Sequence, residues 1–191
     1  MQALHQRSIS DPDNWTSLLS DWSNPHLMPH MARLPKGWMS KTRLKYHVFG
    51  LMNYGTQKLI LYPHFDYWTH DANLHISFLW CYLKNCFRAN LPLGKNLMIQ
   101  MDNCFKDNKN KFLLGFLASL VARKMFKVIE VYYLQPGHSH DMVDFECFGP
   151  MGRKARHMYD FLTPEEFWNN FVARSFARRK KKPEFLSNVC V

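Results

Sequence analysis

Short apolar segments separated by polar turns open the chain, and their spacing predicts strands. Residues 15–22 (WTSLLSDW) alternate between apolar and polar positions, which predicts a strand that ends at Asp21. Residues 43–52 and 58–62 flank the turn sequence NYGT, which predicts an antiparallel hairpin with Gly55 at a positive-φ position. The stretch 24–41 holds three prolines and a glycine, so we expect it to be an exposed connection.

A helical period replaces the strand pattern further along. Asp71 or Asn73 can cap a helix that runs to about Asn90, with one face formed by Ile76, Leu79, Leu83 and Phe87. Residues 109–126 predict a second helix, with an inward face formed by Phe112, Phe116, Leu120 and Val121.

Two apolar strands surround the second helix. Residues 97–101 (LMIQM) are almost continuously apolar, as in a central strand covered on both faces, and the strand delivers Asp102 at its carboxyl end. Residues 128–134 (VIEVYYL) form the next strand, and the helix between them makes a βαβ crossover.

Two helices are expected after the last strand. Ser139 can cap the first of them, and Thr163 with Glu166 forms a capping box that opens a final helix to about Ala177. The order of elements predicts an α/β fold of the RNase H-like type. Its mixed five-stranded sheet would have three antiparallel strands, then two parallel ones, with helices flanking the sheet.

Composition sets the class and the domain plan. Hydrophobic residues make up 47% of the 191 residues, which is enough for one packed domain. We expect residues 1–14 to be a flexible segment, 15–177 the domain, and 178–191 a basic tail. There is no secretory signal and no apolar run of the roughly 20 residues that a membrane helix needs, so we expect a soluble intracellular protein. The five cysteines are irregularly spaced, which argues against disulfides and against a CxxC zinc module.

The charge balance indicates a polyanionic partner. Lys and Arg number 25 against 15 Asp and Glu, which gives a net charge of +10. Nucleic acid is therefore the expected partner, and no membrane partner is expected. The residues expected to bind nucleic acid are Arg153, Lys154, Arg156, Arg178, Arg179, Lys180, Lys181 and Lys182. A solvated, frayed terminus explains the last five of these equally well.

Three acidic residues form the candidate chemical site. Asp21 and Asp102 end strands that are neighbours in the predicted sheet, and Asp144 lies one turn into the following helix. Three carboxylates without thiolates suit Mg²⁺ or Mn²⁺, and two such ions can activate an oxygen nucleophile and stabilise the charged phosphorus of a phosphodiester. Each acid also has a structural explanation, because Asp commonly caps turns and helices. His138 and His140 could instead bind Zn²⁺, although no partner pair appears at finger spacing.

The motifs around these acids resemble a known family. The QMDNC segment at 100–104, the KDNKNK block at 106–111, and LQPGHSH at 134–140 with Asp144 look like an uncharacterised transposase-like domain family. That family carries a DN…ENKN…GH[ST]HxxxD pattern, occurs in repeated copies in eukaryotic genomes, and is similar in layout to DDE/RNase H-like transposase and integrase cores. The resemblance covers about residues 15–160. It implies DNA in particular as the partner, and the nucleus as the compartment.

The resemblance implies roles for particular residues. Asp21, Asp102 and Asp144 match the three catalytic acids that hold the metal, with His138 and His140 beside the third. Asn103, Asn108 and Asn110 match the polar block that follows the second acid. The match at Asp21 departs from the family, since Trp22-Ser23-Asn24 replaces the usual Asp-Gly-type turn and further acid. Glu146 is a rival third ligand, but it lies two residues from Asp144 and so points to a different helix face.

Three functions remain open from the sequence. The first is a transposase- or integrase-like core that cleaves or transfers DNA strands with Mg²⁺. Such a chain could be a degenerate copy or a fragment of a larger element, and the protein could form an oligomer. The second is a catalytically inactive nucleic-acid-binding protein derived from a transposable element. The third is an interaction protein with an exposed aromatic patch of Trp68, Phe161, Phe167 and Trp168, although aromatics at helical spacing are more often core.

Overall fold

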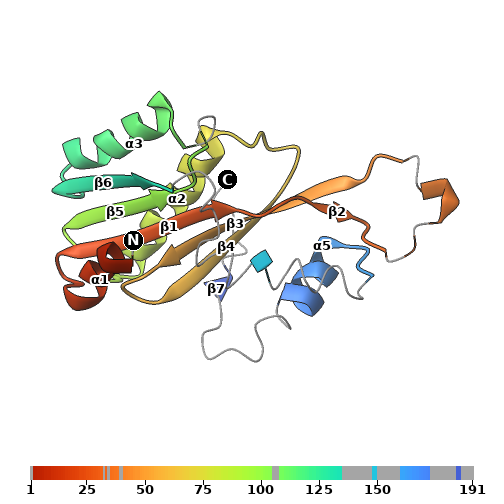
Figure 1. Ribbon diagram of the computed structural model, residues 1–191, viewed down its shortest axis with the longest axis horizontal. Coiled ribbons are helices and arrows are strands. Elements are labelled where there is room, and N and C mark those ends of the chain that lie inside the picture. The colour runs from red at the N-terminus through yellow and green to blue at the C-terminus, as the bar shows by residue number, and fades with distance from the viewer. Residues whose placement is uncertain are drawn as a thin grey trace.

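The computed structural model forms one mixed sheet with helices on both faces (Figure 1). It describes residues 2–31, 33, 35–38, 41–104, 108–134, 148–149, 160–172 and 184–185. The expected α/β class is confirmed. The expected helix that begins at Ser139 lies outside the described residues. Where the chain is described, no helix is long and apolar enough to cross a membrane.

The five expected strands form the body of the sheet. They are β1 (Trp15–Trp22), β3 (Leu44–Asn53), β4 (Lys58–Phe65), β5 (Asn96–Met101) and β6 (Val128–Tyr133). The sheet order is β6-β5-β1-β3-β4-β7, with the short β7 (Glu184–Phe185) at one edge and β2 (His26–Met28) paired to β3. Among the described residues the sheet therefore has seven strands, not the five expected, because two short segments extend its margins.

Strand directions follow the expected plan. β1 pairs antiparallel with β3, and β3 pairs antiparallel with β4. β1 pairs parallel with β5, and β5 pairs parallel with β6, so the βαβ crossover is confirmed. The hairpin turn differs in detail, because Gln57 rather than Gly55 has the positive φ, at 56°. Gly55 lies close to the first helix instead, since a Cβ there would be 3.1 Å from the Ser8 carbonyl oxygen.

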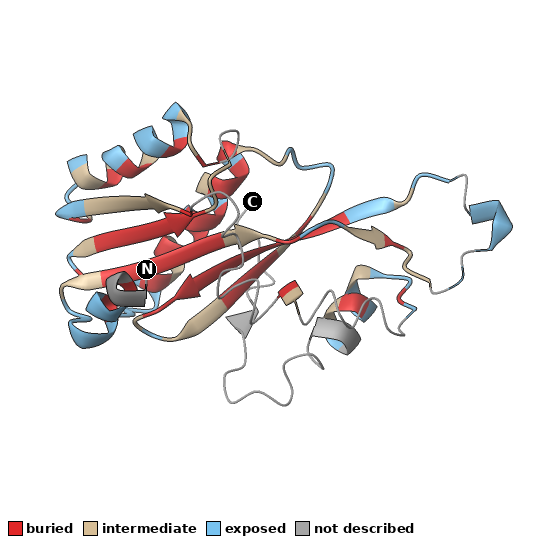
Figure 2. Ribbon diagram, in the orientation of Figure 1, coloured by how far each residue is buried: buried red, intermediate tan, exposed pale blue. Residues whose placement is uncertain are grey.

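Two helices cover one face of the sheet. α2 (Ala72–Arg88) begins after Asp71, whose carboxylate accepts hydrogen bonds from the backbone of Asn73 and Leu74. α3 (Lys111–Ala122) is capped in the same way by Asn110. Together with apolar residues of β1, β3, β4 and β5 they enclose the larger core. The buried interiors of these strands stand out in Figure 2.

The inward faces of both helices were only partly predicted. Leu79 and Leu83 are buried as expected, but Phe87 is largely exposed, and its place in the core is taken by Phe78, Tyr82 and Cys86. In α3, Leu120 is buried as expected, but Phe112 is exposed, and Leu113 and Leu117 are buried in its place. Long aromatic side chains at the ends of amphipathic faces are easily assigned to the wrong side, since a helix turns by 100° per residue.

The opposite face begins with a helix where a flexible segment was expected. α1 (Gln2–Ser10) docks on the sheet through His5, which hydrogen-bonds the Ser17 hydroxyl at 2.6 Å and the Gln100 side chain at 2.7 Å. The ring of His5 also stacks on Tyr54 at 3.7 Å. The sequence prediction failed here because this docking depends on polar pairs with distant strands and not on an apolar stripe.

A second core on that face lies nearer the other end of the sheet. Phe161 precedes α5 (Pro164–Glu166), and Phe167 opens η3 (Phe167–Val172). Both rings are buried with Leu19, Met28 and other apolar residues of β1 to β4. The expected capping box is present in part, because the Thr163 hydroxyl accepts from the backbone N–H of Glu166 while the Glu166 carboxylate accepts from Leu162.

The stretch expected to be an exposed connection contains a short strand pairing and forms an arm. β2 pairs with the first residues of β3, and η1 (Lys36–Trp38) lies between them. The described residues between 26 and 46 form this arm, which projects beyond the body of the sheet (Figure 1). Its base is fixed, because His30 and Phe161 exchange two backbone hydrogen bonds and their rings stack at 4.6 Å. The prolines prevent a long strand here, but they do not prevent the short ladder of β2 with β3.

Candidate functional site

The first two predicted acids lie side by side at the carboxyl ends of neighbouring strands. β1 and β5 are parallel, and their register pairs Ser20 with Met101. The next position on each strand is Asp21 and Asp102, so the two acids are opposite one another in the continued register. Both residues are half-buried. The prediction that their strands are neighbours in the middle of the sheet is confirmed.

The two acids also belong to the same face. Leu19 on β1 packs into the core that contains Phe161, and strand alternation places Asp21 on that side as well. Gln100 on β5 bonds to His5 of α1 on the same face. Asp102 lies two positions after Gln100, one residue beyond the end of β5, so the alternation of the strand places it on that face as well. Opposite Asp21 on β3 is Gly50, which adds no side chain to crowd the carboxylate.

A buried polar network lies behind the acids, on the side of α2 and α3. His75 of α2 is within 3.1 Å of the Ser20 hydroxyl through Nε2, and Nδ1 lies 2.8 Å from the side-chain oxygen of Asn108. The amide nitrogen of Asn108 donates to the backbone carbonyl of Asp102 at 3.0 Å. The Tyr133 hydroxyl on β6 donates to the backbone carbonyl of Asn108. The network thereby connects α2, β1, β6 and the end of β5 immediately behind the two acidic positions.

The network requires a neutral histidine in one tautomer. Because the Asn108 oxygen can only accept, Nδ1 of His75 must carry the proton, and Nε2 then accepts from the Ser20 hydroxyl. Burial lowers the pKa of His75 to about 4, even though its bond to Asn108 favours the charged form. His75 therefore acts as an uncharged bridge at neutral pH, and the carboxylates carry the charge at this end of the sheet.

One carboxylate oxygen of Asp21 already has a local partner. Its Oδ1 accepts a hydrogen bond of 2.8 Å from the backbone N–H of Trp22. The Trp22 ring itself points to the other face, where it packs against His70, His64 and Phe49. Trp22, which departs from the family pattern, thus packs against the core on the α2 face of the sheet.

The donor chemistry of the pair suits a hard cation. Two carboxylates from adjacent strand ends are ligands that Mg²⁺ and Mn²⁺ prefer. Within the described ranges, no group of three or more His, Cys, Asp or Glu side chains is arranged to hold a metal ion. The third predicted ligand, Asp144, its rival Glu146, and the motif histidines His138 and His140 lie outside the described residues.

Other predicted residues can be placed in part. Asn103 is half-buried directly after Asp102, and its supporting role stays a prediction. Asn110 is the N-cap of α3, so this member of the polar block has a structural role. The nucleic-acid-binding predictions lie outside the described residues: Arg153, Lys154, Arg156, Arg178, Arg179, Lys180, Lys181 and Lys182.

The exposed aromatic patch that an interaction protein would need is not formed. Phe161 and Phe167 are fully buried, and Trp168 packs against the same core. Trp68 alone of the four is exposed to an appreciable extent. Phe161, Phe167 and Trp168 are therefore core residues, as expected from the sequence.

Sequence reasoning missed the residues that support the site. His75 was hidden in an apolar helix, where a single polar residue gives little signal, although Asn108 falls in the polar block of the resemblance. His5 was missed because residues 1–14 looked irregular. Only the packing of α1 and α2 against β1 shows that both histidines bridge strands.

Comparison with solved structures supports the fold. The chain superposes on the mariner Mos1 paired end complex with Mg at a TM-score of 0.56 and 14% identity, covering 95% of this chain and 54% of that one. The Mos1 strand transfer complex superposes at a TM-score of 0.51 and 13% identity, covering 93% of this chain and 55% of that one. A pre-cleavage Mos1 transpososome superposes at a TM-score of 0.51 and 14% identity, covering 93% of this chain and 53% of that one. The chain therefore spans just over half the length of these Mos1 chains and shares the RNase H-like fold of a transposase.

Comparison at the level of sequence identifies the family. No curated protein sequence matches the chain. One family model, described as Domain of unknown function (DUF7869), matches residues 36–187. The matched range begins within the arm and includes β3 to β6 with α2 and α3, but it does not include β1, which carries Asp21. The chain belongs to the DUF7869 family.

Proposed function

We propose that this chain is a transposase- or integrase-like core that cleaves or transfers DNA strands with the help of Mg²⁺ or Mn²⁺. Asp21, Asp102 and Asp144 would hold the metal. The observation that carries the proposal is the in-register placement of Asp21 and Asp102 at the carboxyl ends of adjacent parallel strands. The likeness to Mos1 complexes, one of them containing Mg, supports it through the shared fold.

The residues of this chain would divide the work. Divalent ions held by the acids would supply charge stabilisation at the phosphorus and would activate an oxygen nucleophile. Asp21 and Asp102 would fix the position of that charge on the sheet, because their backbones belong to hydrogen-bonded strands. Asn108 and His75 would hold the end of β5 in place through the Asp102 carbonyl, without touching the substrate.

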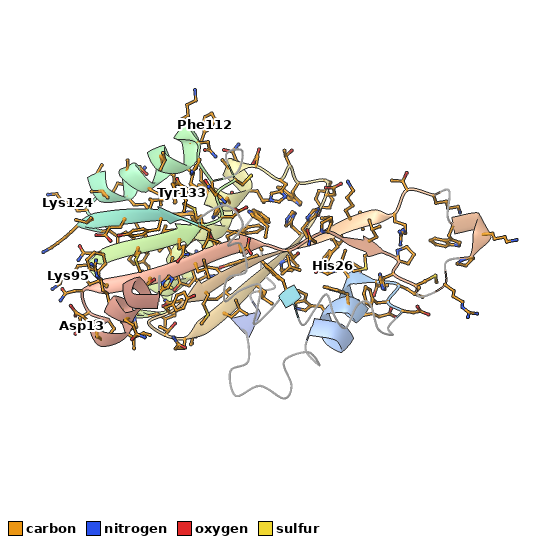
Figure 3. All side chains as sticks on the ribbon, in the orientation of Figure 1. Asp13, His26, Lys95, Phe112, Lys124 and Tyr133 are labelled. Atoms are coloured by element: carbon orange, nitrogen blue, oxygen red, sulfur yellow. The ribbon has the colours of Figure 1, made fainter. Side chains whose placement is uncertain are left out.

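The test is cleavage of labelled duplex DNA in Mg²⁺, in Mn²⁺ and in EDTA. Asp102→Asn should reduce the rate at least about a hundredfold, because it removes the charge of a ligand and keeps the shape of the side chain. Asp13→Asn is the matched control, since Asp13 lies at the opposite end of the sheet (Figure 3). Equal rates for the wild type and Asp102→Asn would refute the catalytic assignment.

A second measurement does not depend on turnover. A metal that binds only the folded chain raises its melting temperature. MgCl₂ or MnCl₂ should therefore stabilise the wild type and the Asp13→Asn variant, but not Asp102→Asn. A metal-induced shift that is the same in all three proteins would place the cation elsewhere.

The alternative is an inactive relative that only binds nucleic acid. The net charge of +10 favours it, as does the departure from the family pattern after Asp21. It predicts salt-sensitive DNA binding in EDTA with no cleavage under any metal condition.

A further inference from the structure

The distribution of charge along the chain singles out the arm. None of the 15 Asp and Glu residues lies between Trp22 and Phe65. Over the same stretch the arm carries the cations Arg33, Lys36, Lys41, Arg43 and Lys45. The arm therefore lies in the longest stretch of the chain without an acidic residue, the stretch between Asp21 and Asp66.

The cations of the arm are available to a partner. Arg33, Lys36 and Lys41 are exposed. Among the ion pairs of the described residues, the only arm cation in a pair with a carboxylate is Lys45, whose Nζ lies 3.5 Å from Asp66. The ammonium of Lys41 lies 5.3 Å from the centre of the exposed Trp38 ring. The tip therefore presents positive charge together with a flat aromatic surface.

The arm leaves the sheet at the end that carries the acids. β1 ends at Trp22, directly after Asp21, and β2 begins at His26. The base is held by the His30–Phe161 bridge and by Phe167, which contacts His26 and Tyr46. A fixed base reduces the entropy lost when the tip is immobilised by a partner. Figure 1 shows that the arm extends away from the end where β5 and β6 begin.

We propose that the arm binds the phosphate backbone of duplex DNA next to the position of the acidic residues. Exposed guanidinium and ammonium groups that are not neutralised by carboxylates are the groups that replace counterions on DNA. Acidic side chains repel phosphate, so their absence over this stretch favours the same partner. A second copy of this chain is a poorer partner, because it carries the same charge of +10. The inference rests on the proposed function for the choice of DNA as substrate.

The test is DNA binding by the full chain in EDTA, so that metal chemistry does not contribute. The triple variant Arg33→Gln, Lys36→Gln, Lys41→Gln should bind a labelled duplex at least about tenfold more weakly at 0.1 M salt. The slope of log K against log salt should fall in magnitude by about 2 to 3, since each lost phosphate contact removes about one.

The matched control removes the same charge from the other end of the sheet. Lys95→Gln, Arg123→Gln, Lys127→Gln changes three exposed cations near the starts of β5 and β6. Lys95 is labelled in Figure 3 at the end opposite the arm. This variant should retain nearly all of the wild-type affinity. Equal losses in the two triple variants would overturn the proposal, because net charge alone would then explain binding.

Other outcomes separate this inference from the proposed function. Normal binding by the arm variant would overturn the arm assignment, even if Asp102→Asn abolishes cleavage. Arm-dependent binding without any cleavage would support the arm and refute the catalytic proposal. A change in sedimentation of the arm variant without a change in DNA affinity would show a protein interface instead. Urea unfolding of both triple variants should match the wild type, because all six side chains are exposed.

Discussion

The two ends of the β1–β5 strand pair are built in different ways. At the amino end backbone N–H groups make the contacts: the Gly94 N–H donates to the Thr16 hydroxyl at 2.7 Å, and the Asn96 N–H donates to the Asn14 carbonyl at 2.9 Å. A Cβ on Gly94 would lie 2.5 Å from backbone atoms of Trp15. The carboxyl end carries Asp21 and Asp102, which contribute no apolar packing.

This difference indicates that residues at the amino end contribute mainly to stability, and that residues at the carboxyl end are placed for chemistry. The amino end is closed so tightly that it leaves no room for a side chain or a ligand. The carboxyl end holds two carboxylates, and the buried network of Ser20, His75 and Asn108 fixes their strands from behind. Substitutions at the two ends should therefore affect different measurements.

The largest effect is expected at the closed end. Gly94→Ala places a methyl group against the main chain of Trp15, which cannot give way as a flexible side chain would. We expect a loss of about 3 kcal/mol or more in the free energy of unfolding, measured with urea. Gly115→Ala in α3 is the control, because its Cβ meets nothing within 4 Å, and there the helix should gain about 0.5 to 1 kcal/mol. Similar stabilities for both variants would show that the amino end is not closed as described.

A smaller effect is expected in the network behind the acids. Asn108→Ala removes the partner of His75 Nδ1 and of the Asp102 carbonyl, and it should cost about 2 to 3 kcal/mol, because buried polar groups lose their bonds. Asn110→Ala, two residues along, removes only the cap of α3 and should cost about 1 kcal/mol. Urea unfolding of the two variants measures the difference. An equal cost would mean that the network adds nothing beyond ordinary capping.

The smallest effect is a dependence on pH. Burial lowers the pKa of His75 and of His64 to about 4, from 6.5. Unfolding then takes up protons between these values, so stability is complete above pH 6.5 and is lost as the pH falls toward 4. For His75 the loss between pH 6.5 and pH 5 is roughly 2 kcal/mol.

Urea titrations at the two pH values test this dependence. His75→Gln, which keeps polar atoms but does not titrate, should show a weaker decline in stability with falling pH than the wild type. An identical decline in both proteins would show that His75 does not contribute to it.

The strands were the most predictable part of the fold. Segments such as LMIQM are apolar enough to require a central position, and their order left few arrangements for the sheet. The helix caps at Asp71, Asn110 and Thr163 were visible for the same reason, since they act through neighbours in sequence. The placement of Phe87 and Phe112 was wrong, because only tertiary packing decides which end of an amphipathic face is covered.

The candidate site was predictable in its residues but not in its support. Asp21 and Asp102 follow from the rule that groups at the carboxyl ends of parallel strands meet. The bridge from His75 to Asn108 joins residues that are distant in sequence, and its geometry depends on how α2 lies across the sheet. The angle between α2 and the strands cannot be predicted from any local sequence pattern.

The sequence by itself determined the order of strands and helices along the chain, the helix starts and the absence of acids from the arm, because these depend on neighbouring residues and on composition. The tertiary structure alone decided that α1 docks on the sheet through His5, that residues 26–46 project as an arm, and that Asp21 stands level with Asp102. Such features arise from contacts between distant segments, and their free energy comes from packing and paired polar groups that no single segment contains.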